Sequence, residues 1–356
     1  MQITRAKLKA YQLPFSTPWK SSKGILRDRH GWLISLTDTT GLTGYGDAAP
    51  LPEMGTETLQ QAEEWLNPQL SALMGGEPEQ CLHALPCAET RPAGRFGLET
   101  ALLDLHAKQC GIPLYRLLTD RKPGSIRVNA TIGSLEPGIE ARTQAALSAG
   151  FTTLKLKLGR YPLDEELAAL QKLCKRLPAG CQLRLDANQV WHEESTDVLI
   201  QGLGGLPIES LEEPFSDLDL SRLDKLQAAV PFDLALDESL RGFLRDHPLS
   251  DLPVKRIIIK PTLLGGILSS LKLIQEADQR GIHCVITSSL ESSAGIWPLL
   301  HLAAAADRIT LPAIHGLATV NWFSRDLGNA PFISSGLIRL EAGPGSGFIL
   351  GAEKTD

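Results

Sequence analysis

The sequence has little that would tie it to a membrane, to nucleic acid or to an oxidising compartment. No apolar run approaches the roughly 18 residues that a membrane-spanning helix needs, and the start of the chain alternates like a strand, without the apolar core of a signal peptide. The formal net charge of -6 and the isoelectric point near 5.8 argue against a broad electrostatic grip on nucleic acid or an anionic membrane. The six cysteines form no CxxC pair, as is typical of reduced thiols in a cytosolic protein. We therefore expect a cytoplasmic protein that binds neither nucleic acid nor membrane, and nothing in the sequence indicates its oligomeric state.

The length and composition are those of a chain with more than one folded domain. The 356 residues include 43% hydrophobic and 21% charged side chains and no low-complexity tract, so the chain can bury a sizeable core. Residues 3–13, 31–37 and 42–47 alternate like strands, and the last two flank a turn. Residues 56–73 and 94–109 carry apolar side chains at helical spacing. Strands followed by helices predict an α+β domain in this first part of the chain.

From about Ser125 the pattern changes to short apolar runs, each followed by a helical stretch. Strands that alternate with helices favour a parallel α/β barrel, and an open doubly wound sheet is the alternative. We predict an α/β fold, a modified TIM (β/α) barrel over residues 123–319, with an α+β capping domain at residues 1–122. Because residues 332–348 return to glycine-rich strand signals, we expect about residues 320–356 to complete the cap. The eight expected barrel strands span residues 126–132, 153–158, 182–186, 209–212, 233–237, 256–260, 284–288 and 308–311.

Two lysines lie on one face of the second expected strand. Residues 154–158 read Leu-Lys-Leu-Lys-Leu, so Lys155 and Lys157 share one face and the leucines share the other. If the leucines pack on the surrounding helices, both ammonium groups point into the barrel, where burial is costly unless anionic groups lie nearby. The alternative is an edge strand whose lysines face solvent.

Charged side chains also end the next four expected strands. Counted from Lys157, the steps are 29 residues to Asp186, 26 to Glu212, 25 to Asp237 and 23 to Lys260. Each step fits one strand-and-helix unit, so all five side chains can rim the barrel mouth at which barrel enzymes keep their chemistry. One acidic strand end is often only a helix cap, but three in succession, flanked by lysine-bearing strands, predict a site.

Three carboxylates without histidine or cysteine favour a hard cation bound through oxygen. Mg²⁺ suits such a set, with Mn²⁺ as a substitute, because it prefers carboxylate and water and leaves positions open for substrate oxygen. We therefore expect Asp186, Glu212 and Asp237 to be the metal ligands. A metal ion that holds a substrate carboxylate stabilises the dianion formed when the adjacent carbon loses its proton, and a nearby lysine can be the base. The expected partner is thus a small-molecule carboxylate.

Taken in order, these elements resemble the enolase superfamily. The matching motifs are residues 155–157, 185–188, 211–214, 236–239 and 259–261 in the expected barrel, and residues 46–52 in the expected cap. The resemblance implies two catalytic lysines, Lys157 and Lys260, on opposite sides of the barrel mouth. Lys155 is expected to lower the pKa of Lys157 through its like charge. We also expect residues 16–29 of the cap, rich in Ser, Lys and Gly, to form a mobile loop that contributes to specificity.

Within that superfamily, residues 285–295, 260–266 and 237–241 are most similar to the o-succinylbenzoate synthase family of the muconate-lactonising subgroup. Its members are lyases that dehydrate 2-succinyl-6-hydroxy-2,4-cyclohexadiene-1-carboxylate in menaquinone or phylloquinone biosynthesis, and the resemblance implies the same reaction here. The residues expected to contact the substrate are Thr287, Ser288, Asn188 and Arg184.

Other members of the superfamily remain alternatives. Dipeptide epimerases resemble this catalytic set but typically end the seventh strand in aspartates that hold the peptide ammonium, whereas residues 287–289 here carry hydroxyl groups. Muconate-lactonising enzymes share the lysine pair. N-succinylamino acid racemisation is the closest alternative, and an inactive, metal-binding relative is a further one. His315, near the eighth expected strand, is a minor candidate for the wall of the site.

Overall fold

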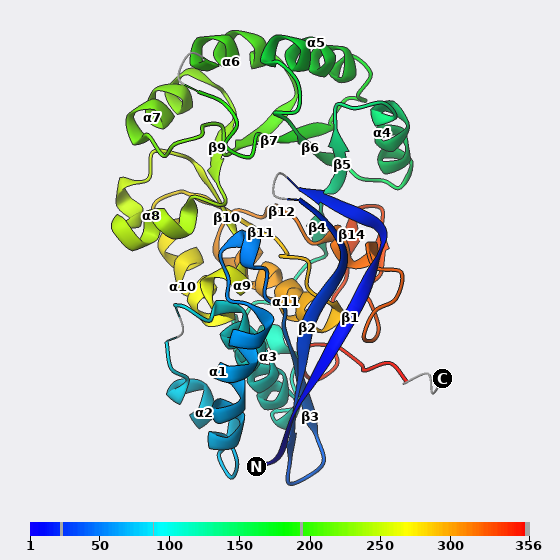
Figure 1. The fold of residues 1–356 in the computed structure, drawn as a ribbon, viewed down its shortest axis with the longest axis vertical. Helices are drawn as coiled ribbons and strands as arrows, with labels where there is room; N and C mark the ends of the chain where they lie inside the picture. Colours follow the sequence, from blue (N-terminus) through cyan, green and yellow to red (C-terminus); the bar gives the residue numbers. More distant parts are fainter. Residues whose placement is uncertain (22–23, 88, 193–194, 353–356) are drawn as a thin grey trace.

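The computed structural model describes residues 1–21, 24–87, 89–192 and 195–352, and it has a cap of strands and helices beside a parallel barrel (Figure 1). The α+β cap predicted from the sequence is therefore confirmed. Its strands are β1 (Ile3–Ser21), β2 (Gly24–Asp38) and β3 (Thr43–Ala48). Its helices are η1 (Pro52–Met54), α1 (Leu59–Ala72), α2 (Pro78–Ala84), α3 (Pro92–Gln109) and η2 (Leu114–Leu117).

Strands β1 and β2 form a long antiparallel hairpin that reaches from the cap to the barrel (Figure 1). The pairing extends to Trp19 opposite Leu26, so the expectation of a loop over residues 16–29 is wrong for the described part of that segment. The pairing shifts register between Pro14 and Trp19 and then resumes, so backbone pairing outweighs the Ser- and Lys-rich composition. Residues 22–23 lie outside the described residues.

Eight parallel strands form the barrel, and its seven consecutive strands from β5 to β11 pair in sequence order. Asn129 alone separates β4 from β5, so the two act as one bent first strand. The barrel strands are β4 (Ile126–Val128), β5 (Ala130–Ser134), β6 (Thr153–Lys157), β7 (Gln182–Asp186), β8 (Ile208–Glu212), β9 (Asp233–Leu236), β10 (Arg256–Ile259), β11 (His283–Ile286) and β12 (Ile314–His315).

The short strand β12 closes the ring. On one side it pairs in parallel with β4, and on the other the Gly316 amide donates to the Ile286 carbonyl at 2.8 Å. The Ser288 amide in turn donates to the Gly316 carbonyl at 3.2 Å. A closed ring of this kind is a barrel and excludes the open doubly wound sheet.

The eighth expected strand was misplaced. Arg308 belongs to the last turn of helix α11 (Ser293–Ile309), and the strand follows at β12. Helix α11 is buried along most of its length, so its sequence is apolar on every side and gives no periodic signal of where it ends. The other barrel helices are α4 (Ile139–Ser148), α5 (Leu163–Cys174), α6 (Ser195–Leu203), α7 (Leu220–Ala229), α8 (Leu240–Asp246), η3 (Leu249–Asp251), α9 (Pro261–Leu264) and α10 (Ile267–Asp278).

The C-terminal tail contacts both parts of the molecule. After η4 (Ala318–Asn321), strands β13 (Ile333–Ser334) and β14 (Leu337–Ile338) add to the sheet beside β4 of the barrel. Phe323 instead stacks on Phe15 of the cap hairpin, with ring centroids 4.8 Å apart. The boundaries 1–122 and 320–356 that we assign to the cap stay a prediction, because the tail joins the two parts.

The barrel core explains which side chains are left to face its interior. The leucines of β6 and β7 are fully buried in the main apolar core, so the alternating lysines and acids point the other way.

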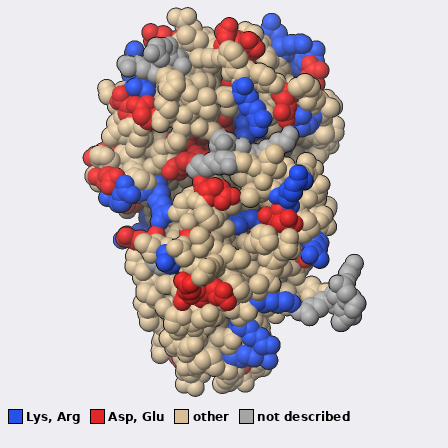
Figure 2. Space-filling view, viewed as in Figure 1, with Lys and Arg blue, Asp and Glu red and all other residues tan. Residues whose placement is uncertain are grey.

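The six cysteines are free thiols. No helix in the described ranges has the length and apolar character that crossing a membrane requires. Basic and acidic side chains are interspersed over the face shown in Figure 2.

Candidate active site

One cavity at the C-terminal mouth of the barrel gathers the residues expected as catalytic, metal-binding and substrate-binding groups. Strands β6, β7 and β8 pair in register there, so that Lys157, Asp186 and Glu212 stand side by side at the ends of neighbouring strands. The cavity wall includes Lys155, Lys157, Arg184, Asp186, Asn188, Glu212, Asp237, Lys260, Thr287 and Ser288. The structure places these side chains around one cavity, and their catalytic, metal-binding and substrate-binding roles stay predictions.

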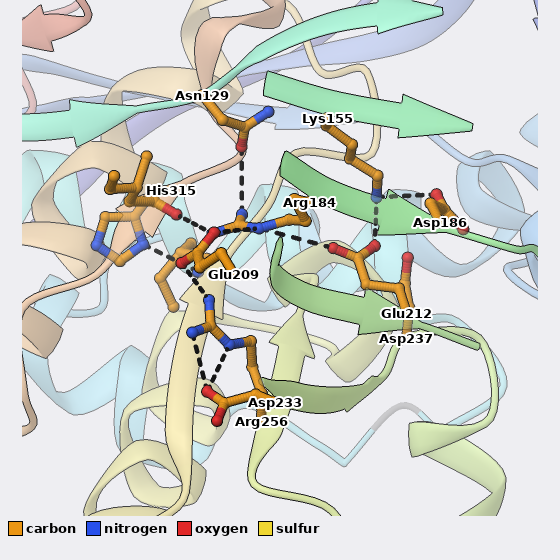
Figure 3. Close-up of polar contacts among 12 residues, drawn as sticks. Asn129, Lys155, Arg184, Asp186, Glu209, Glu212, Asp233, Asp237, Arg256 and His315 are labelled. Atoms are coloured by element: carbon orange, nitrogen blue, oxygen red, sulfur yellow. Dashed lines mark hydrogen bonds and ion pairs between the residues drawn. The ribbon is translucent and has the colours of Figure 1, made fainter. Parts of the chain in front are cut away.

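Two lysines pair directly with the three carboxylates. The Lys155 ammonium lies between Asp186, at 2.9 Å, and Glu212, which it contacts more closely still (Figure 3). The Lys260 ammonium donates to Asp237 at 2.6 Å and is 7% exposed on its side chain. The strict alternation of β6 therefore places its lysines inside the barrel, beside compensating charge, and not on a solvated edge.

The two lysines of β6 differ in their electrostatics. Burial alone would lower the pKa of Lys155, but the carboxylates of Asp186, Glu212 and Asp237 outweigh it and raise that pKa. The pKa of Lys157 is lowered, chiefly by burial and to a smaller extent by the charge of Lys155. The expected direction thus holds, although burial is a larger cause than the neighbouring ammonium. Lys157 is the lysine suited to act as a base.

The three carboxylates fit a hard divalent cation by their chemistry. Oδ1 of Asp237 is buried without a hydrogen-bond partner among the described residues, which leaves an oxygen free to bind a ligand. Among the described residues, no three His, Cys, Asp or Glu side chains are grouped so that they could hold a metal ion. The ammonium groups of Lys155 and Lys260 contact the three carboxylates. A cation would have to displace these ammonium groups from the carboxylates. The magnesium site at Asp186, Glu212 and Asp237 therefore stays a prediction.

Glu213 supports this arrangement, and the sequence reasoning did not assign it a role. It has a positive φ of 43° and its buried carboxylate accepts from the backbone amides of Asp237 at 2.7 Å and Ser239 at 2.8 Å. It also accepts from the side chain of Gln189 at 3.0 Å. Glu213 thus joins the ends of β7, β8 and β9. The paired glutamates before Pro214 were its only sequence signal.

Arg184 lies deeper in the barrel than Asp186 and Glu212, and its hydrogen bonds are made inside the barrel. Its guanidinium, 1% exposed, donates to both carboxylate oxygens of Glu209, to the side chain of Asn129 and to the Ile314 carbonyl (Figure 3). Arg256 pairs with the same Glu209 from the other side. These contacts hold the floor of the cavity, and because Arg184 also lines it, the substrate contact that we expected stays a prediction. Asn188 follows the end of β7, and its backbone N–H donates to the Asp186 carboxylate at 3.2 Å.

The wall formed after β11 is neutral and carries hydroxyl groups. Ser288 Oγ lies 2.7 Å from Thr319 Oγ1, and Thr287 lies against Gly316 of the closing strand. Leu290 continues this wall. His315 is not part of it, because it is completely buried and its Nδ1 accepts from the Ile286 amide at 3.0 Å.

Two tryptophans complete the cavity from outside the barrel. Trp19, near the end of the β1–β2 hairpin, places its ring centroid 5.4 Å from the Lys157 ammonium, a cation–π distance. Trp322 contributes from the tail. The sequence pointed to residues 16–29 as a segment of the site but carried no signal for which side chain would reach the barrel.

Comparison with known proteins agrees with this geometry. The family profile described as Enolase C-terminal domain-like matches residues 139–354, and the profile described as MenC, N-terminal domain matches residues 3–105. The L-Ala-D/L-Glu epimerase of Bacillus subtilis (strain 168) is 28% identical over 87% of this chain and 87% of its own length. An o-succinylbenzoate synthase of Aliivibrio fischeri (strain MJ11) is 31% identical over 90% of this chain and 92% of its own length. The N-succinyl-L-Arg/Lys racemase of Bacillus cereus is 25% identical over 98% of this chain and 95% of its own length.

Solved structures are similar over the whole chain. A substrate-liganded complex of the L-Ala-D/L-Glu epimerase from Bacillus subtilis has a TM-score of 0.86 at 27% identity, covering 99% of this chain and 100% of that one. The dipeptide epimerase from Enterococcus faecalis V583, complexed with Mg and L-Leu-L-Tyr, has a TM-score of 0.84 at 25% identity, with 98% and 99% covered.

The barrel, the cap and these similarities define an enzyme. The chain belongs to the enolase superfamily. Within it, the chain falls in the muconate-lactonising subgroup, where epimerases, racemases and o-succinylbenzoate synthases share this fold.

Proposed function

We propose that this enzyme dehydrates 2-succinyl-6-hydroxy-2,4-cyclohexadiene-1-carboxylate to 2-succinylbenzoate, a step of menaquinone or phylloquinone biosynthesis. The observation that carries the proposal is the neutral wall of Thr287, Ser288 and Leu290, which offers hydroxyl groups and no carboxylate to a substrate tail. Such a wall suits a succinyl group better than a peptide ammonium, which needs a negative partner. The match of residues 3–105 to the MenC N-terminal profile supports the same choice.

Asp186, Glu212 and Asp237 would hold the Mg²⁺ ion, or Mn²⁺ in its place, through their carboxylate oxygens. When bound, the cation would lower the cost of the negative charge that builds up on the substrate carboxylate as the adjacent carbon loses its proton. The Lys155 ammonium contacts Asp186 and Glu212, and its positive charge offsets the repulsion between these two carboxylates.

Lys157 would be the base, because its lowered pKa leaves a larger neutral fraction near neutral pH than an ordinary lysine has. In a syn elimination it takes the proton from the carbon and returns it to the departing hydroxyl group on the same face. The C–H and C–O bonds break, the ring becomes aromatic and one water molecule leaves. Lys260, four strands away around a ring of eight, would stay protonated and stabilise the negative charge from the other side.

A second candidate is the racemisation of N-succinylamino acids. The same opposition of Lys157 and Lys260 favours it, since two lysines on opposite faces of one carbon can exchange its proton in both configurations. The similarity to the N-succinyl-L-Arg/Lys racemase of Bacillus cereus also favours it.

Lysine variants distinguish the two reactions. We expect Lys157→Ala to lose nearly all dehydration, because the base is gone, and Lys260→Arg to keep much of it, because the cation is retained. The same Lys260→Arg variant should fail to exchange one face of an N-succinylamino acid in heavy water, since arginine does not act as a base. Substantial dehydration by Lys157→Ala would overturn these roles.

A further inference from the structure

A buried arginine of the cap is bonded to the wall of the cavity without reaching the cavity itself. Arg29, on β2, is 3% exposed and donates to the carbonyl groups of Ala49 and Pro50 within the cap. It also donates across to the barrel, to the carbonyl of Leu290 at 3.1 Å and of Ser289 at 3.4 Å. One guanidinium therefore links two parts of the molecule. One is the cap segment at Ala49 and Pro50, just before helix η1, and η1 lines the cavity. The other is the neutral wall after β11.

Asp47, on β3 of the cap, holds the other end of the same wall segment. It is completely buried and accepts from both the amide and the hydroxyl of Ser292 at 2.7 Å. Tyr11 donates to its second oxygen at 2.5 Å. The cap thus binds carbonyl groups at residues 289–290 and hydrogen-bond donors at residue 292, so the segment is held at both ends.

The held segment is strained. Leu290 has a φ of +64°, a left-handed conformation that side chains other than glycine adopt rarely and at a cost. Glu291 fixes it from the barrel side by accepting from the Ser289 amide at 2.7 Å. The Leu290 side chain belongs to a buried apolar cluster with Leu13 and Phe15 of the cap hairpin and Phe323 of the tail. A strained conformation of this kind persists only where the surroundings determine it, and Arg29, Leu13 and Phe15 of the cap are part of those surroundings.

We propose that Arg29 and Asp47 form a clamp, a pair of positioning residues through which the docked cap holds residues 289–292, strained at Leu290. The clamp thereby positions the adjoining wall residues Thr287 and Ser288 and sets which substrate tail fits. The part of the proposal that concerns substrate choice rests on the proposed function. Neither residue lines the cavity, so each acts through the backbone that it binds.

The first test is kinetic. We expect Arg29→Met to lower kcat/KM for dehydration by about tenfold or more, mainly through KM, because bonds from a charged donor are lost and the wall relaxes. The ratio of dehydration to N-succinylamino acid exchange should change with it. Arg29→Lys, which keeps the charge and some donors, should recover part of the loss.

Arg95→Met is the matched control. Arg95 also reaches from the cap to a barrel carbonyl, that of Gly265, but Gly265 does not line the cavity. This control should leave the substrate ratio unchanged. If it altered the ratio as much as Arg29→Met does, the effect would be a general loosening of the cap, and the clamp would be rejected.

The second test does not depend on any substrate. Hydrogen exchange of a peptide spanning residues 284–296 should become faster in Arg29→Met and in Asp47→Asn, while peptides from β7 to β9 keep their protection. The double variant should be little worse than the poorer single one, because both residues hold one segment. If Arg29→Met does not fold, Arg29→Lys takes its place in the comparison.

The outcomes separate the clamp from the proposed function. Unchanged exchange in residues 284–296 would overturn the clamp whatever the enzyme's substrate is. Faster exchange with an unaltered substrate ratio would overturn the link to specificity. A wild-type enzyme that turned over neither substrate would overturn the proposed function and that link together, while exchange would still decide whether the clamp exists.

Discussion

The ammonium group of Lys157 lies 5.4 Å from the ring centroid of Trp19, so the cap hairpin reaches the lysine that we propose as the base. Burial is the largest cause of the lowered pKa of Lys157, and Trp19 lines the same cavity. A cation–π contact favours the charged ammonium, whereas burial disfavours it, and we infer that the burial to which Trp19 contributes is the larger effect and helps to keep that lysine neutral.

Trp19→Ala should expose Lys157 to water and raise its pKa towards the ordinary lysine value. Since a base must be neutral to act, the rise of kcat/KM with pH should move to higher pH in this variant. Trp19→Phe keeps much of the burial of the lysine and should shift the profile less. A profile for Trp19→Ala that overlies the wild-type profile would show that the hairpin does not control this lysine.

Replacing Asp186, Glu212 or Asp237 with alanine should abolish most activity and weaken metal binding by a hundredfold or so, as loss of a charged ligand does. Binding of Mn²⁺, followed by electron paramagnetic resonance, gives a readout that is independent of turnover. Asp217→Asn, an exposed acid outside the cavity, is the control. Full activity of any of the three variants in metal-depleted buffer would rule out the metal site.

Bulky apolar replacements in the neutral wall should impair recognition of the succinyl tail. Ser288→Leu and Thr287→Leu should raise KM, or lower kcat/KM, because they fill the space and remove the hydroxyl groups. Ser288→Asp should instead disfavour a succinyl carboxylate and favour a tail that carries an ammonium group. Steady-state kinetics on both classes of substrate check this, and unchanged constants would remove these residues from the site.

His301 should make the fold sensitive to acid. It is fully buried, accepts from the Tyr115 amide at 3.0 Å and faces the Ser346 carbonyl at 2.9 Å. Burial lowers its pKa to about 4, so the folded protein resists the proton that the unfolded chain takes up below about pH 6.5. Its contribution is complete above that pH and is lost between pH 6.5 and 4, up to about 3 kcal/mol.

His301→Gln can make both hydrogen bonds without titrating. Urea unfolding at a series of pH values should therefore show a smaller loss of stability between pH 6.5 and 4 in this variant than in the wild type. His83→Gln, at an exposed position of α2, is the control. Parallel losses in the wild type and His301→Gln would assign the acid sensitivity to other groups.

Much of the barrel and its mouth could be predicted because strand periodicity and strand-end charges are local signals. The alternation in residues 154–158 is enough to direct Lys155 and Lys157 to one face, and the spacing to Asp186 follows from one strand-and-helix unit. The boundary of α11 could not be read in this way, because a helix buried on all sides has no polar face to mark its end.

Which side chains of the cap reach the barrel could not be predicted from the sequence. Trp19 reaches Lys157, and Arg29 reaches Leu290, only after two parts of the chain that are far apart in sequence have docked. The partner of Arg184 could not be predicted for a related reason. That partner, Glu209, is on the next strand, and a bidentate pair deep in the barrel leaves no pattern in the sequence.

The most direct measurement compares turnover of the cyclohexadiene carboxylate with proton exchange of N-succinylamino acids by the purified wild-type enzyme, with Mg²⁺ and after its removal. We predict Mg²⁺-dependent dehydration with a kcat/KM well above that for exchange, and the loss of both reactions when the metal is removed. Rapid exchange of N-succinylamino acids or dipeptides without detectable dehydration would contradict the account.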